Sequence, residues 1–147
     1  MDLSLDLAAV ITRLDALKAD NTLRKVGAAI DVPSAEEAIK NQLPAAFVVP
    51  GREMASGDRP LNDARQLVVE SFSVVLVVTN RRDAQGAHAH ADLRTLRGKV
   101  QEKLLGWTPD AALYDTFMFD RGALLSLSEL QLWWVDSFRT RRYLEAV

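Results

Sequence analysis

Apolar residues that recur every three or four positions predict the helices of this chain. One such pattern spans about residues 4–19 and another about residues 88–105. Spacing of this kind places the apolar side chains on one face of a helix. A shorter helix is indicated within residues 32–43, where Ser34 and Glu37 form a capping-box pattern. We therefore expect two main amphipathic helices and one short one.

Alternating and continuous apolar runs predict the strands. The first is short, at about residues 23–30, and the second covers about residues 45–49, where Pro50 and Gly51 are expected to stop it. The longest covers about residues 65–80, and its second half is apolar at almost every position. A strand with this composition is typical of the centre of a sheet, covered on both faces.

The last part of the chain predicts further strands. Residues 113–119 indicate a short strand, and residues 123–127 and 130–140 indicate the two arms of a hairpin that turns near Ser128 and Glu129. Because the strands follow one another late in the chain, the order favours an α+β fold over a doubly wound parallel one. We expect all 147 residues to form one domain, with a mostly antiparallel sheet of about four to six strands and two main helices packed against it.

Two adjacent tryptophans in the last strand must point to opposite faces, because side chains alternate along a strand. Trp134 shares its face with Leu130 and Phe138 and is predicted to belong to the core. Trp133 shares its face with Gln131 and other polar residues, which predicts a residue that contacts another protein or lies under a loop. We expect Trp134→Ala to destabilise the fold and Trp133→Ala mainly to weaken association.

A long segment without periodicity, residues 51–64, is predicted to be a mobile loop that orders on assembly. We expect an oligomer or partner interface to contain residues from this segment and from the face of the last strand that carries Trp133. These candidate interface residues are Trp133, Val135, Arg139, Arg52, Met54 and Arg59.

Composition narrows the classes of function. The chain is 48% hydrophobic and 26% charged with a net charge of −2, which is ordinary for a globular protein and unlike a nucleic-acid-binding domain. It contains no cysteine, which excludes disulfides and fits a reducing cytosol. No apolar run approaches the ~20 residues that span a bilayer. Two small basic clusters, Arg81–Arg82 and Arg139 with Arg141 and Arg142, are interpreted as a solvated strand end and turn, and the alternative is a contact with an acidic partner surface.

A metal site is the main chemical alternative. His88, His90 and Asp92 resemble the HxHxD core of metallo-β-lactamase-type hydrolases, but Leu93 stands where that motif continues with histidine. The chain has only these two histidines, and residues two apart on a helix do not share a side. We interpret the segment as a polar helix N-terminus. We expect no catalytic residue, no metal and no cofactor.

Four segments together, spanning about residues 43–141, resemble the tail terminator family of tailed bacteriophages, which is related to the lambda minor tail protein U. The most specific pieces are "GWTP" after the second main helix and the ending "WW.D.F.T". The segments are "PAAFVVPGREMA", "QLVVESFSVVLVV", "LRTLRGKVQEKLLGWTPD" and "LQLWWVDSFRT".

The resemblance implies a structural virion protein and not an enzyme. Such small α+β domains close into a ring, usually of about six copies, which caps the tail tube, ends its polymerisation and offers the surface that joins the head. The implied partners are further copies of the chain, the tail tube protein and a head–tail connector protein, with no membrane and no specific nucleic acid. The implied location is the virion tail of a phage or prophage, after synthesis in the host bacterial cytoplasm. The alternatives are a small metal-dependent hydrolase that uses His88, His90 and Asp92, or an oligomeric adaptor of unrelated origin.

Overall fold

The computed structural model describes residues 5–29, 32–38, 42–55, 65–80, 87–128 and 130–145. Within them, helices pack on a five-stranded sheet of order β1-β2-β3-β5-β4, which confirms the predicted α+β class. No helix among these residues is long and apolar enough to cross a membrane. The elements are α1 (Leu7–Asp15, followed by a 3-10 turn at Ala16–Lys18), β1 (Lys25–Ala28), α2 (Val32–Ala38), β2 (Ala45–Ala55), β3 (Arg65–Thr79), α3 (Ala87–Leu104), β4 (Met118–Leu127) and β5 (Gln131–Glu145).

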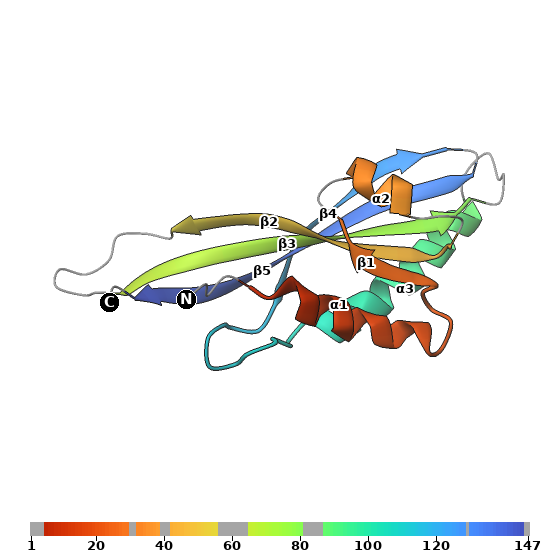
Figure 1. Cartoon of the computed structure of the whole chain (residues 1–147). Coiled ribbons are helices and arrows are strands. Elements are labelled where there is room, and N and C mark those ends of the chain that lie inside the picture. Colours follow the sequence, from red (N-terminus) through yellow and green to blue (C-terminus); the bar gives the residue numbers. More distant parts are fainter. Residues whose placement is uncertain are drawn as a thin grey trace.

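The sheet is antiparallel except where β1 pairs with β2. Its longest ladder joins β3 and β5, from the pair Arg65 and Glu145 to the pair Thr79 and Gln131. Figure 1 shows α1 and α3 on one face of the sheet, which we call the helix face, and α2 on the other, which we call the open face. It also shows that β2, β3 and β5 extend beyond α1 and α3 as a three-stranded projection.

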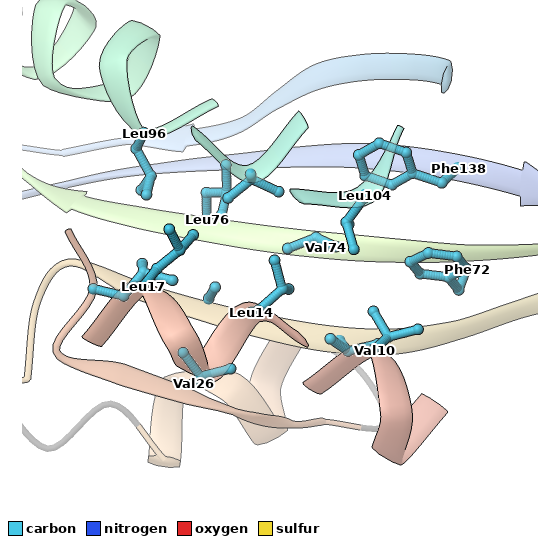
Figure 2. Close-up of a cluster of buried hydrophobic side chains, with 14 of the residues drawn as sticks. Val10, Leu14, Leu17, Val26, Phe72, Val74, Leu76, Leu96, Leu104 and Phe138 are labelled. Atoms are coloured by element: carbon cyan, nitrogen blue, oxygen red, sulfur yellow. The ribbon is translucent and has the colours of Figure 1, made fainter. Parts of the chain in front are cut away.

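The main core lies between the helix face and its two helices. Phe72, Val74 and Leu76 alternate along β3 toward α1 and α3 and are fully buried (Figure 2). Phe72 stacks on Phe138 with ring centroids 5.6 Å apart and meets Phe117 edge-on at 4.9 Å. Burial of a large apolar side chain stabilises a fold by roughly 1.5–3 kcal/mol. The partners on the helices are Val10, Leu14, Leu17, Leu93, Leu96, Val100 and Leu104.

A second, smaller core lies on the open face beneath α2. Phe47, Val75, Val77 and Trp133 are buried there together with Ala35 of α2. The odd-numbered residues of β3 supply this core and the even-numbered ones supply the main core. The prediction that the second half of this strand is covered on both faces is therefore confirmed.

The predicted stop of the second strand at Pro50 is wrong, because β2 continues to Ala55. β1 pairs with β2 only over residues 45–48, so from Pro50 onward β2 is an edge strand among the strands that the structure describes. Proline lacks a backbone N–H group. On the outer side of an edge strand no neighbouring strand accepts a hydrogen bond, so the missing group loses no pairing there. A register shift between Pro50 and Glu53 marks a bulge at the same place.

The predicted loop at residues 51–64 is wrong in its first part, which belongs to β2 and includes Arg52 and Met54. Residues 56–64 lie outside the described residues, so mobility there stays a prediction. Gly51 explains how the strand continues. A Cβ atom at this position would overlap the backbone of Ser71 on β3, so only glycine permits this approach of the two strands.

One strand replaces the two that were predicted at residues 113–119 and 123–127. β4 starts at Met118 and runs through Gly122 to Leu127 without interruption, with register shifts against β5 between Phe119 and Arg121 and between Leu124 and Ser126. The hairpin to β5 turns where expected. The backbone N–H of Ser128 donates to the carbonyl of Gln131 at 2.9 Å.

The "GWTP" segment ties the end of α3 to α1. Gly106 has φ +75°, a left-handed conformation that favours glycine and ends α3. Trp107 meets the ring of Phe117 edge-on, and the guanidinium of Arg13 lies 4.9 Å above the Trp107 ring. The Nε of Arg13 also donates to the carbonyl of Lys103 at 2.9 Å. These residues hold the scaffold together.

Candidate protein interface

The histidine segment forms the first turns of α3, as the helix pattern predicted. His88, His90 and Asp92 are all exposed there. In the described part of the chain, no group of three or more His, Cys, Asp or Glu side chains could hold a metal ion. The alternative of a metal-dependent hydrolase gains no support from this arrangement.

We predict that replacing His88 and His90 together with alanine leaves the free energy of unfolding within about 0.5 kcal/mol of the original value, as for ordinary surface changes. Both side chains are exposed, and alanine favours the helix. Thermal melting measures the stability, and metal analysis of the purified protein accompanies it. Stoichiometric zinc that the original chain retains and the variant loses would contradict this reading.

Asp136 anchors α3 to the sheet through a buried ion pair. Its carboxylate is fully buried and accepts hydrogen bonds from Nε and Nη2 of Arg97 at 2.9–3.2 Å. The indole N–H of Trp134 donates to the same carboxylate at 2.9 Å, and the Arg97 guanidinium lies 4.6 Å above the Trp134 ring. Gly122 on β4 leaves room for this cluster, because a Cβ there would come within 2.7 Å of the carboxylate.

The predicted solvated basic cluster near the end of β5 is wrong for Arg142. This side chain is buried, with Nη2 2.6 Å from the carboxylate of Glu53 and Nε 3.3 Å from that of Glu70. Burial opposes its charge, but the two glutamates outweigh that cost and raise the pKa of Arg142 above its ordinary value. The backbone N–H of Leu5 donates to Glu70 at 2.8 Å, so the cluster also fixes the segment before α1.

The two adjacent tryptophans do point to opposite faces, but Trp133 is the more deeply buried of the two, the reverse of the prediction. Trp133, expected to contact another protein or to lie under a loop, is only 5% exposed and lies in the smaller core, covered by the helix α2. Its indole N–H donates to the side-chain carbonyl of Gln131 at 2.9 Å. Trp134, expected in the core, is half-buried and packs against the main core on the helix face. Leu130, also expected in the core, is 59% exposed at the hairpin turn. The second face was assumed to be solvated, and α2 covers it.

Three of the other candidate interface residues come together on the open face. Arg52, Met54 and Arg139 line one hollow of about 260 Å³, and Arg121 of β4 joins them. We call this site the arginine hollow; its lining also includes Ala55, Val69, Ser71 and Asp120. Val135 lies half-buried against the second core on the same face. Arg59 lies outside the described residues.

The outer edge of the sheet is a second candidate surface, which the sequence did not indicate. All ten residues of β4 are exposed, and its outer side pairs with no strand in the part of the chain that the structure describes. An edge of this length with large apolar side chains invites pairing with another chain. The large exposed apolar residues of β4 are Met118, Phe119, Leu124, Leu125 and Leu127.

Comparisons with known proteins bear on what these surfaces do. The family model for "Phage tail terminator protein" matches residues 1–146. No curated protein matches the chain. A similar solved structure is a chain of the "Virion of native gene transfer agent (GTA) particle", with a TM-score of 0.55, 17% sequence identity and 93% of each chain covered. At this identity the likeness shows a shared fold.

Proposed function

Because this chain belongs to the phage tail terminator protein family, we propose that it closes the end of a phage tail tube as a ring of identical subunits. The family is structural and not enzymatic, and the chain is a component of the virion tail. In the proposed role, the ring of about six copies stops the tube from growing and presents a surface to the head. Its partners are further copies of the chain, the tail tube protein and a head–tail connector protein.

The free edge of β4 is the observation that most supports a ring. Its unpaired backbone groups and its exposed leucines can pair with a strand edge of the next copy. The opposite edge of the sheet, at β1, runs antiparallel to β4 within one subunit. A rotation axis along the strands would therefore bring β4 and the β1 edge of the next copy together in antiparallel orientation. A head-to-tail contact of this kind closes into a ring.

Tube length tests the function itself. Adding the purified chain to polymerising tail tube protein of its own phage should yield capped tubes that no longer elongate. The physical reason is that the ring covers the face to which the next tube ring would bind. Electron microscopy measures the lengths, with serum albumin as the protein control. Tubes that grow equally long with and without the chain would contradict the function.

The ring contact is tested by placing lysines on the β4 edge. We predict that Leu124→Lys combined with Leu125→Lys weakens self-association at least about tenfold, because charged edge residues oppose strand pairing. Both leucines are about half exposed, so the subunit should stay folded and lose no more than about 1 kcal/mol of stability. Sedimentation velocity in the presence of tail tube protein measures the association.

Leu113→Lys is the matched control for this variant, because Leu113 is similarly exposed but lies in a turn and not in a strand. It should assemble normally. Unchanged assembly of the β4 variant, or an equal loss in the Leu113 variant, would rule out the β4 edge as the ring contact.

A further inference from the structure

The arginine hollow gathers guanidinium groups from three different strands. Arg52 comes from β2, Arg139 from β5 and Arg121 from β4, and all three are exposed. The register explains the meeting, since Ser71 of β3 pairs with Arg139 and lies beside Arg52, whose backbone N–H donates to the Ser71 hydroxyl at 3.1 Å. The three side chains therefore form a staggered row across the strands, because Arg121 pairs with Ser137, two residues before Arg139.

Little negative charge within the described residues balances this row. No described carboxylate forms an ion pair with Arg52 or Arg139, and Asp120 lies 3.7 Å from the Nε of a largely exposed Arg121. By contrast, Arg97, Arg141 and Arg142 each have a carboxylate oxygen at 2.6–2.9 Å. Among the described residues of a chain whose net charge is −2, this arrangement places more positive than negative charge on one face, which attracts a negative partner.

Apolar side chains line part of the hollow, and this favours one kind of partner over another. Met54 and Val69 line it, and an adjoining hollow of about 250 Å³ shares Val69 and Arg139 and adds Met118. Nucleic-acid affinity grows with the number of phosphates that a protein neutralises, and three arginines beside methionines offer few such contacts. A protein segment can supply both carboxylates and apolar side chains.

We propose that the arginine hollow binds an extended, carboxylate-bearing segment of another protein of the tail, by a contact separate from the β4 edge. Adjacent strands are roughly 4.8 Å apart, and alternate side chains of an extended segment are roughly 6.7 Å apart on one side. Because β3 lies between β2 and β5, Arg52 and Arg139 are two strand spacings apart, roughly 9.6 Å, and their long side chains can meet acidic residues on one side of a segment that crosses the strands. Guanidinium groups pair with carboxylates in a bidentate manner. The identity of the partner as a tail protein rests on the function proposed above, whereas the binding chemistry does not.

The experiment titrates the isotope-labelled full-length chain with an eight-residue peptide that alternates glutamate and valine. Side-chain Nε–Hε signals of the arginines are followed by NMR in low salt. We expect the signals of Arg52, Arg121 and Arg139 to shift and those of Arg24 and Arg94, which are exposed elsewhere, to stay in place. A peptide that alternates glutamine and valine should cause no shift.

Charge reversal gives the matched comparison. Arg121→Glu combined with Arg139→Glu should weaken binding of the acidic peptide about tenfold or more, equivalent to ~1.4 kcal/mol. Arg24→Glu combined with Arg94→Glu changes the net charge equally and should keep most of the affinity. The site assignment fails if the two double variants lose affinity equally, or if the original chain shows no localised shifts.

Tighter binding of a short DNA duplex at the same three arginines would instead assign the hollow to nucleic acid and overturn the proposal. The titration needs neither a ring nor a tube. It can therefore fail while the tube-length experiment succeeds, and the reverse also holds.

Discussion

Trp133→Ala should destabilise the folded subunit by about 3–5 kcal/mol, as large-to-small changes of buried aromatic residues do. The indole fills the core between β5 and α2 and is 5% exposed. Phe47, Val75 and Val77 would lose their contact with it, and the cavity could close only if α2 moved. The loss is a large fraction of the ~5–15 kcal/mol that holds a domain together. Urea denaturation followed by circular dichroism measures the effect.

Trp134→Ala is the natural comparison, because the neighbouring indole is only half-buried. It should cost less, about 1–3 kcal/mol, through the lost packing and the lost hydrogen bond to Asp136. Trp133→Phe should restore much of the stability that Trp133→Ala removes. A Trp133→Ala variant that melts normally while Trp134→Ala unfolds would show that α2 does not cover this face in solution.

Asp136→Ala should cost about 3 kcal/mol, because removing one partner of a buried ion pair leaves the other without its counter-charge. The carboxylate is fully buried and serves both Arg97 and Trp134, so the alanine variant leaves two donors unsatisfied. Arg97 is 28% exposed, and partial solvation of its guanidinium limits the loss. Denaturant unfolding at neutral pH measures the difference.

Asp115→Ala provides the matched control. Its carboxylate also pairs with an arginine at 2.9 Å, but both side chains of the Asp115–Arg141 pair are more than half exposed. Exposed pairs contribute about 0–1 kcal/mol, so this variant should unfold almost as the original does. Equal losses for the two variants would mean that the burial of Asp136 is not what makes its ion pair important.

The alternation of side chains predicted the faces of the long strands correctly. Phe72 and Phe138 lie on the helix face, and Val75 and Trp133 lie on the other, as their parity requires. The sequence could not indicate what covers the second face, because that depends on how α2 packs through Ala35. In the same way, whether Pro50 ends its strand depends on whether β1 pairs with β2 as far as this residue.

The resemblance to the tail terminator family is confirmed by the match over residues 1–146. Its most specific residues turn out to determine the scaffold. Asp136 pairs with Arg97, Phe138 stacks on Phe72, and the hydroxyl of Thr140 donates to the carbonyl of Asp115 at 2.6 Å. A signature made of such contacts identifies the fold reliably and says little about the interface.

The candidate surfaces were only partly predictable. Arg52, Met54 and Arg139 were selected from separate segments, and the pairing of Met54 with Val69 and of Ser71 with Arg139 brings them to one hollow. Strand register is a tertiary property that this sequence alone did not reveal. The β4 edge was missed because its apolar run was interpreted only as one arm of a hairpin, and its position at the end of the sheet follows from the strand order.

The ladder between β3 and β5 also constrains how the chain folds. It joins Arg65 to Glu145 and Thr79 to Gln131, so every pair closes a long loop that contains α3 and β4. Loop closure costs entropy before the pairing stabilises anything, and chains dominated by distant pairs fold in roughly milliseconds to seconds. The β4–β5 hairpin and α3 can form locally first, whereas the two central strands must wait for each other. During that delay the apolar second half of β3 is uncovered on both sides, which makes the folding chain most vulnerable to aggregation before its sheet is complete.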